Sequence, residues 1–290
     1  MKICRYQYAS DDVASGPIHI GVVEGDSVRD VSVVTETLPS LRWPLPPGDQ
    51  FIAHLDKLRP RIAELARAAT PVPLAAVRLK SPVANPGKFV CGAGNHVDVL
   101  ARGGHPRQLG LLFKMTSAAA GAADGVTLRW PERVTFHEIE LAIVIGRPGT
   151  EIAAADALNH VAGYAIGLDM TMQGKEFPSF GKSFDSYGVI GPWLVTADEI
   201  PDPSQLSYVL KVNDEVRTQD SISRLVLGVP ELIEHVASIM TLHPGDVIFS
   251  GTPPGSVGPV RPGDTMHAQM DCIGAMRVGV RGGPGRRTAP

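Results

Sequence analysis

Short apolar runs alternate along the chain with turns that are rich in glycine and proline. The 31 glycines and 25 prolines, together with sparse helical periodicity, favour many short strands joined by turns. The run "LAIVIG", which ends at residue 146, is typical of a strand buried inside a sheet. Two "PGD" turns, at 244–246 and 262–264, each border a strand candidate, "VIFSG" and "TMHAQMD". The pattern therefore predicts an α+β protein that is rich in β-structure.

Residues 1–75 are predicted to form a small N-terminal α/β domain. They begin with strand-like pieces, "IHIGVVEGDSVRDVS", that turn at Gly25. A helix is expected near 50–69, broken at Pro60, because proline removes a helical hydrogen bond. Residues 72–88, "PVPLAAVRLKSPVANPG", are rich in proline and are interpreted as a connection to the next domain.

Residues 76–280 are expected to form the larger, β-rich domain, and 281–290 a flexible tail. Two helices are expected within the larger domain, one near 153–161 and one at 230–240, where Pro230 suits a first helical turn. The apolar positions that share one face of the second helix are Leu232, Ile233, Val236, Ile239 and Met240.

Composition narrows the class of protein. The chain is 43% hydrophobic and 20% charged, which is enough apolar material for a sizeable core. Its net charge of -3 argues against a nucleic-acid partner, which normally needs a basic face. No apolar run approaches the roughly 20 residues of a membrane span, the first residues do not resemble a signal peptide, and the three cysteines are scattered. A cytoplasmic protein without a membrane partner is expected.

Two carboxylates, Glu138 and Glu140, stand directly before the apolar run. On a strand, residues two apart point to the same face and lie about 6.6 Å apart. Ionised carboxylates at that distance repel each other, and a divalent cation removes the conflict. Sites built from oxygen atoms without thiolates suit Mg²⁺ or Mn²⁺. The pair alone also allows a second interpretation, in which both side chains face water at a sheet edge.

Three later segments carry further polar residues at the ends of apolar runs. The segment "GYAIGLDMT" contains Asp169, which by itself is more typical of a turn or a helix cap than of a metal ligand. The segment "GKSFDSYGVIGPWLVT" contains Lys182 and Asp185, and "LHPGDVIFSGTPPG" ends in a tight loop with Thr252. Together with the E-x-E strand, in this order and at these spacings, the segments resemble the fumarylacetoacetate hydrolase family.

The resemblance covers about residues 85–280, and the N-terminal part resembles the small leading domain of longer family members. It implies a mixed β-sandwich roll of the fumarylacetoacetate hydrolase type and, usually, a homodimer. It also implies a divalent metal, Mg²⁺ or Mn²⁺, held by Glu138, Glu140 and Asp169.

Family substrates are small acids with a 2-oxo or β-dicarbonyl group, including acylpyruvates. A cation that chelates such a substrate stabilises the enolate that develops as a C–C bond breaks. The resemblance implies that Lys182 points into the cavity, that Gly251 and Thr252 hold a substrate carboxylate, and that Lys114 lies near the substrate. Without the resemblance, Lys182 and Lys114 could be surface lysines, and the loop with Gly251 and Thr252 could be a purely structural turn.

One family motif is altered in a way that affects catalysis. Hydrolytic members carry G-x-N-Y-x-x-H-x-x-E, in which the histidine and glutamate together activate water. Here the segment is "GAGNHVDVLAR". Asn95 matches the asparagine, but His96 replaces the tyrosine, Val99 the histidine and Arg102 the glutamate. The His–Glu pair is therefore absent, and valine cannot accept a proton.

A second departure follows the third acid, where D-x-x-x-R-D-x-Q becomes "DMTMQGKE". Gln173 replaces the arginine that would bind substrate, and Glu176 adds an acid to the cavity. Three alternatives remain for the general base: His96, Glu176, or no protein base of the usual kind. His105, in "ARGGHPRQ", is a weaker candidate. His137 is interpreted as structural, because strand alternation points it away from the metal.

The predicted function is metal-dependent hydrolysis of a C–C bond in a small 2-oxo acid or β-dicarbonyl compound. The first alternative keeps the metal but changes the reaction, to a lyase, decarboxylase, hydratase or isomerase, and the valine at position 99 supports it. The second alternative is an inactive relative whose cavity only binds a ligand.

Overall fold

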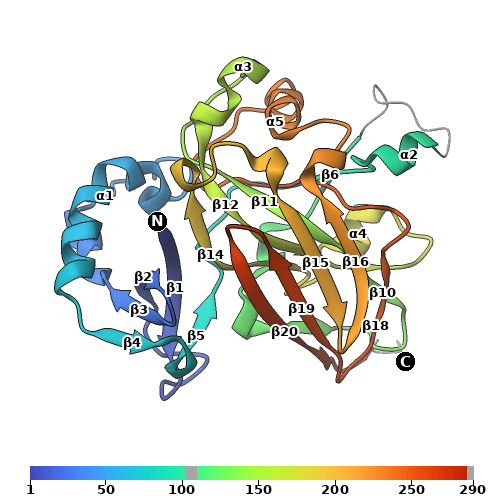
Figure 1. The fold of residues 1–290 in the computed structure, drawn as a ribbon, viewed down its shortest axis with the longest axis horizontal. Helices are drawn as coiled ribbons and strands as arrows, with labels where there is room; N and C mark the ends of the chain where they lie inside the picture. Colours follow the sequence, from blue (N-terminus) through green and yellow to red (C-terminus); the bar gives the residue numbers. More distant parts are fainter. Residues whose placement is uncertain (102–109, 286–290) are drawn as a thin grey trace.

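The computed structural model describes residues 1–101 and 110–285 (Figure 1). Within these residues the strands form a twelve-stranded, a five-stranded and a three-stranded sheet. The twelve-stranded sheet contains β1 (Lys2–Tyr8), β2 (His19–Glu24), β3 (Ser27–Asp30), β4 (Pro71–Pro73), β5 (Val77–Lys80), β6 (Phe89–Gly92), β7 (Leu111–Phe113), β8 (Ala119–Ala120), β11 (Ile139–Ile145), β12 (Val161–Asp169), β14 (Gly188–Thr196) and β17 (Val247–Phe249). The five-stranded sheet contains β9 (Val126–Leu128), β15 (Ser207–Val212), β16 (Glu215–Ser221), β19 (Thr265–Met270) and β20 (Gly274–Gly282). The three-stranded sheet contains β10 (Thr135–His137), β13 (Thr171–Met172) and β18 (Gly258–Val260). The α-helices are α1 (Gln50–Ala68), α2 (Val97–Ala101), α3 (Ala154–Ala157), α4 (Pro178–Lys182) and α5 (Val229–Ala237).

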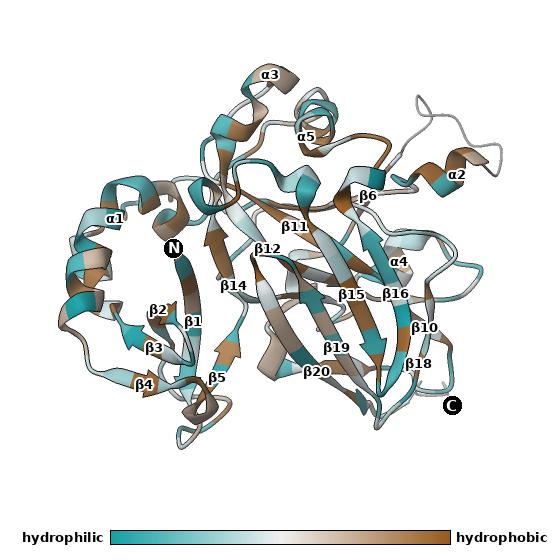
Figure 2. Ribbon diagram, in the orientation of Figure 1, coloured by the Kyte–Doolittle hydropathy of each residue, from teal (hydrophilic) through white to brown (hydrophobic). Residues whose placement is uncertain are grey.

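The N-terminal unit is joined to the rest of the molecule through its sheet. Strands β4, β3, β2 and β1 follow one another, and β1 then pairs antiparallel with β14. Helix α1 lies on one side of this unit and presents a face that alternates teal and brown (Figure 2). The predicted hairpin around Gly25 is confirmed, and Gly25 has the positive φ of +56° that such a turn favours.

The predicted break at Pro60 is wrong, because α1 runs without interruption from residue 50 to residue 68. Pro60 lies on the exposed face, so the carbonyl that loses its partner remains in contact with water. The opposite face is buried, and most helical stability comes from such tertiary packing. The buried residues of this face are Ile52, Leu55, Leu58, Ile62 and Ala66.

Three other local predictions need correction. The connection expected at 72–88 contains β5, which pairs with β1. The helix expected at 153–161 is α3 followed by a 3₁₀ turn at Leu158–His160, and β12 begins at Val161. Helix α5 ends at Ala237, so Ile239 lies beyond it and is 59% exposed. The domain boundary at residue 75 stays a prediction.

Strand β11 lies in the middle of the main sheet, between β12 and β17, and all of its residues are buried. Figure 2 shows brown, hydrophobic positions on β11 and again on β14, which lies on the other side of β12. Side chains of β11 and β12 share one core with Tyr208 and Leu210 of β15 and Met266 of β19. The main sheet and the five-stranded sheet therefore pack face to face, which confirms the predicted β-rich α+β class. Within the described residues, no helix has the length and apolar character needed to cross a membrane.

Candidate metal centre

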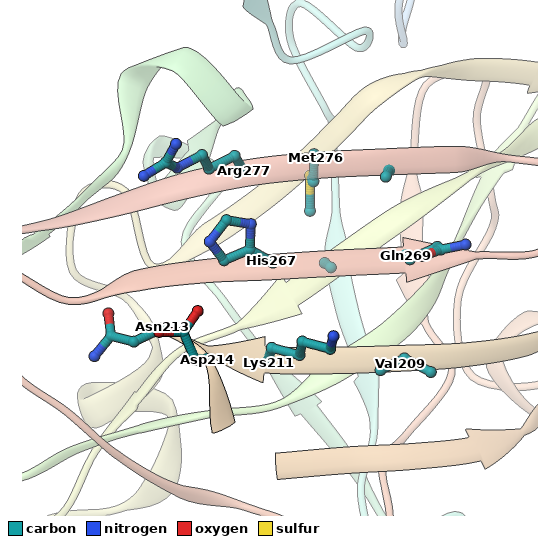
Figure 3. A pocket seen from close by; sticks show the side chains of 10 residues that line it. Val209, Lys211, Asn213, Asp214, His267, Gln269, Met276 and Arg277 are labelled. Atoms are coloured by element: carbon teal, nitrogen blue, oxygen red, sulfur yellow. The ribbon is translucent and has the colours of Figure 1, made fainter. Parts of the chain in front are cut away.

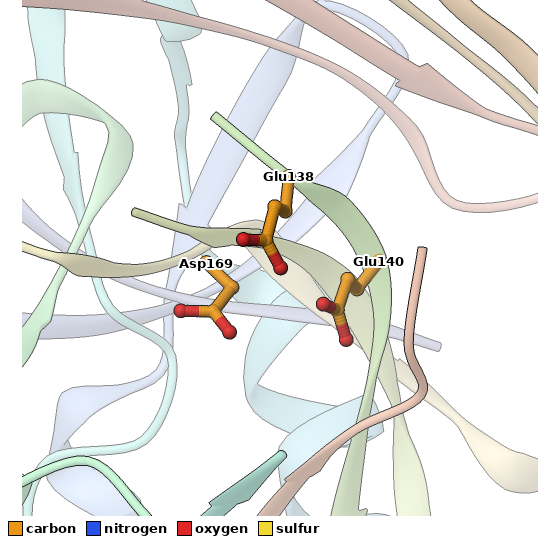
Figure 4. A group of neighbouring side chains, drawn as sticks. All are labelled: Glu138, Glu140 and Asp169. Carbon is orange, nitrogen blue, oxygen red and sulfur yellow. The ribbon is translucent and has the colours of Figure 1, made fainter. Parts of the chain in front are cut away.

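The pairing of β11 with β12 brings three acids together that are distant in sequence. Because the two strands are antiparallel, with Ile139 opposite Leu168, the start of β11 lies beside the end of β12. The backbone N–H of Asp169 donates to the carbonyl of Glu138 at 2.8 Å. Glu138, Glu140 and Asp169 point their carboxylates toward one common space (Figure 4).

The three carboxylates form a closely spaced cluster in which two are buried and Glu138 is half-buried. One oxygen from each lies within 4.8 Å of the others, and Glu140 and Asp169 are 2% and 0% exposed. Burial raises the pKa of Glu138, and it raises the pKa of Glu140 well above its usual range. Burial also acts upward on the pKa of Asp169, but nearby lysines outweigh it and lower that pKa. An all-oxygen donor set of this kind fits Mg²⁺ or Mn²⁺.

Two buried lysines face the same cluster. Lys182 Nζ donates to Asp169 Oδ2 at 2.5 Å and to Thr171 Oγ1 at 2.7 Å, and it lies 3.4 Å from Glu138 Oε2. Lys114 Nζ bonds the other carboxylate oxygen of Asp169. Burial alone would lower the pKa of Lys182, but Asp169 and Glu138 raise it, so its ammonium stays charged. Two positive charges therefore face three carboxylates.

A tight loop after β17 supports one of the acids and offers a free hydroxyl. The N–H of Gly251 donates to Glu140 Oε2 at 2.5 Å. Gly251 has a φ of +101°, and a Cβ there would lie 2.9 Å from Asn95 Cβ, so glycine is required. Asn95 donates to the carbonyl of Ser250 at 2.9 Å. Within the described part of the chain, the buried Oγ1 atom of Thr252 has no hydrogen-bond partner, which leaves it available to a ligand.

These groups line one small cavity of about 160 Å³, a volume that suits a small acid. It contains the three carboxylates, Lys182, Gly251 and Thr252. A larger hollow of about 460 Å³ lies on the outer face of β15, β19 and β20 (Figure 3). Within the described residues, the cluster of Glu138, Glu140 and Asp169 is the one group of three potential metal ligands, so the smaller cavity is the candidate site.

Comparisons with known proteins agree with this geometry. Residues 88–281 match the model of the fumarylacetoacetate (FAA) hydrolase C-terminal domain. The chain belongs to the fumarylacetoacetate hydrolase family. It is 47% identical over 295 residues to maleylpyruvate hydrolase of Aquipseudomonas alcaligenes, covering 97% of this chain and 99% of that protein. It is 32% identical over 284 residues to the mitochondrial oxaloacetate tautomerase FAHD2A of Bos taurus, covering 90% and 87% of the two chains.

A solved structure of the fumarylacetoacetate hydrolase family is similar over its whole length. The maleylpyruvate hydrolase of Sphingobium sp. SYK-6, in complex with manganese(II) and pyruvate, superposes with a TM-score of 0.82 at 35% identity. The match covers 98% of this chain and 100% of that chain. The family resemblance and the fold that it implied are therefore confirmed.

Two residues expected near the substrate of a fumarylacetoacetate hydrolase family member lie outside this cavity. Gln173 is exposed, and its side-chain amide donates to the carbonyl of Thr171 at 3.2 Å. Glu176 is also exposed, and both of its carboxylate oxygens accept hydrogen bonds from Arg133 at 2.8 Å. The segment after β13 thus runs outward, and the ion pair with Arg133 holds the acid there.

The histidine proposed as a general base and the histidine interpreted as structural are both buried. His96 is fully buried but does not line the cavity. His137 is also fully buried, and burial, with a smaller effect from Arg217, lowers its pKa to about 4, which suits a structural role. Arg102 and His105 lie outside the described residues.

Proposed function

We propose that this chain is a divalent-metal-dependent hydrolase that cleaves the C–C bond of an acylpyruvate, and that maleylpyruvate is the first substrate to test. The observation that carries the proposal is the cluster of three carboxylates, two of them buried and one half-buried, beside a charged lysine in a cavity of about 160 Å³. The 47% identity to a maleylpyruvate hydrolase, over nearly the whole of both chains, supports the choice of substrate.

In the proposed site, Glu138, Glu140 and Asp169 hold Mg²⁺ or Mn²⁺. The bound ion supplies a Lewis acid for the oxygens of a 2-oxo acid. Lys182 adds a fixed positive charge next to the substrate oxygens, where water is largely excluded. Thr252 donates its unpartnered hydroxyl to the substrate carboxylate, and Lys114 keeps Asp169 oriented.

The positions of His96 and Glu176 bear on which group could act as the general base. His96 and Glu176 both lie outside the cavity lining, so neither is assigned to this step. Among the described residues, this favours the third alternative, a reaction without a protein base of the usual kind. A second candidate function therefore deserves a test: enol–keto tautomerism or decarboxylation of a 2-oxo acid, for which the relationship to an oxaloacetate tautomerase is relevant.

We expect the protein with Mn²⁺ or Mg²⁺ to cleave maleylpyruvate and release pyruvate. In water enriched in ¹⁸O, hydrolysis places the label in the carboxylate of the other product, which mass spectrometry detects. Oxaloacetate and fumarylpyruvate serve as competing substrates, and Glu140→Gln as the inactive control. If the protein catalyses tautomerism of oxaloacetate but cleaves no acylpyruvate, it is an isomerase and the proposed hydrolase function is wrong. Turnover of none of these compounds would favour a binding protein.

We also propose a homodimer that forms through an apolar patch beside the site. Helix α4 packs against β7 and β13, and apolar side chains around it are exposed, Phe177 by 89%. We define the patch by the exposed apolar residues on or next to α4, β7 and β13, which are Phe113, Met115, Val134, Phe177 and Phe180. Large exposed patches of this kind often mark protein interfaces.

The dimer is tested by removing one aromatic ring from the patch. We expect light scattering to give twice the chain mass for the wild type and a shift toward the monomer for Phe177→Ser. Val13→Ser, at a 64% exposed position of the N-terminal unit, is the control and should stay dimeric. A monomeric wild type would overturn the proposal.

A further inference from the structure

The buried imidazole of His96 has a polar neighbour at each of its two nitrogens. Its Nδ1 accepts a hydrogen bond from the backbone N–H of Asp98 at 3.2 Å. The ring proton of the neutral form therefore belongs on Nε2. That atom lies 3.2 Å from Oδ2 of Asp220, although the N–H does not point squarely at the oxygen. The imidazole thus faces Asp220, on β16, and not the metal cavity.

Arg224 links the two acids that lie beside the imidazole. Its Nη2 lies 2.6 Å from Asp98 Oδ1, and its Nε lies 3.1 Å from Asp220 Oδ1. The backbone N–H of Ser221 donates to the same Oδ1 at 2.8 Å. Oδ1 of Asp220 is therefore occupied, and Oδ2 is left to His96. Chain segments around residues 96–98 and 220–224 are joined by charge-assisted contacts.

The chain segment that leads into His96 forms one wall of the metal cavity. Ala93 and Gly94 line the cavity, just before His96 in sequence. Asn95 fixes the same wall from the other side, through its bond to the carbonyl of Ser250, the residue before the loop that carries Gly251. Asn95 also exchanges two hydrogen bonds with the backbone of Leu227, at 2.9 and 2.7 Å. The wall is thus anchored through Asn95 to the loop beside the carboxylates and to Leu227, and through His96 to β16.

We propose that Asp220 is a positioning residue of this active site, which fixes the wall at Ala93 and Gly94 through His96. The inference rests on the proposed function, since it assigns the wall a part in substrate binding. A partner that only positions the ring needs a hydrogen-bond acceptor and no negative charge. Aspartate offers two acceptor oxygens, one to His96 and one to Arg224 and Ser221. Asparagine keeps only one of them and should therefore preserve part of the positioning, whereas alanine should preserve none.

The test compares Asp220→Ala, Asp220→Asn and, as the matched control on the same hairpin, the exposed Asp214→Ala. Hydrogen exchange of the peptide that covers residues 93–101 reports the wall without any substrate. For Asp220→Ala we expect exchange about tenfold faster, because the contacts that protect this segment are lost. We also expect kcat/KM to fall about 10²-fold, the scale of a 1 Å misplacement in an active site. Asp220→Asn should lie between wild type and Asp220→Ala in both exchange and kcat/KM, with an unchanged pH profile, since it keeps one of the two acceptor oxygens.

Normal exchange in Asp220→Ala would overturn the inference. So would an Asp220→Asn variant as inactive as Asp220→Ala with an intact wall, because the charge itself would then be needed and an acid–base pair with His96 would be indicated. A wild type that cleaves no acylpyruvate would refute the proposed function. The exchange rates, and the affinity for pyruvate in the presence of Mn²⁺ measured by calorimetry, would then still decide the role of Asp220.

Discussion

Replacing Glu140 by glutamine is expected to abolish tight Mn²⁺ binding and to lower kcat/KM by about 10³-fold or more, which corresponds to the several kcal/mol that a metal contributes to charge stabilisation. Glutamine keeps the shape of the side chain but loses its charge, and at 2% exposure water does not take the place of the lost ligand. Calorimetry with Mn²⁺ measures the affinity, and an assay of pyruvate release measures the rate. Glu138→Ala and Asp169→Ala should behave in the same way.

Two controls separate loss of the metal from loss of the fold. Glu36→Gln, at an exposed position of the N-terminal unit, should leave Mn²⁺ affinity and rate unchanged. Chelation of the wild type with EDTA should reproduce the defect of Glu140→Gln, and added Mn²⁺ should restore the chelated wild type alone. An unchanged Mn²⁺ affinity in Glu140→Gln, with a normal melting temperature, would show that the cluster is not the metal site.

The acidic cluster could be predicted because its signal is local. Alternation along a strand places Glu138 and Glu140 on one side, and each acid adjoins an apolar run that becomes a central strand, β11 or β12. The antiparallel register that brings Asp169 to them is not visible in any short segment. It entered the prediction through the order and spacing of the family motifs.

Other features depend on contacts that no local pattern specifies. Nothing near His96 indicates that Asp220, from a strand of another sheet, lies beside it. The exposure of Glu176 depends on Arg133, a partner far from it in sequence. The continuity of α1 through Pro60 follows from tertiary burial of the opposite face, which outweighs the intrinsic preference of proline. Chemical groups are therefore easier to predict from this sequence than the contacts that support them.

Lys182 should affect turnover without weakening the metal site. Lys182→Met is expected to lower kcat by about 10²- to 10³-fold, the usual loss when one charge-stabilising donor is removed from a water-excluded site. Mn²⁺ affinity should stay the same or rise, because the ammonium that lies 2.5 Å from Asp169 and competes electrostatically with the cation is gone. The rate thus falls without any loss of Mn²⁺ affinity, whereas Glu140→Gln lowers both.

The matched control is Lys175→Met, which removes an exposed lysine from the preceding loop and should change neither quantity. Lys182→Arg should not restore the rate, because a planar guanidinium does not reproduce a compact ammonium in a cavity of about 160 Å³. A Lys182→Met variant that retains nearly full turnover would remove this residue from the catalytic machinery. Loss of Mn²⁺ binding together with turnover would instead mean that Lys182 maintains the carboxylate cluster, and that its charge is needed to keep three buried acids together.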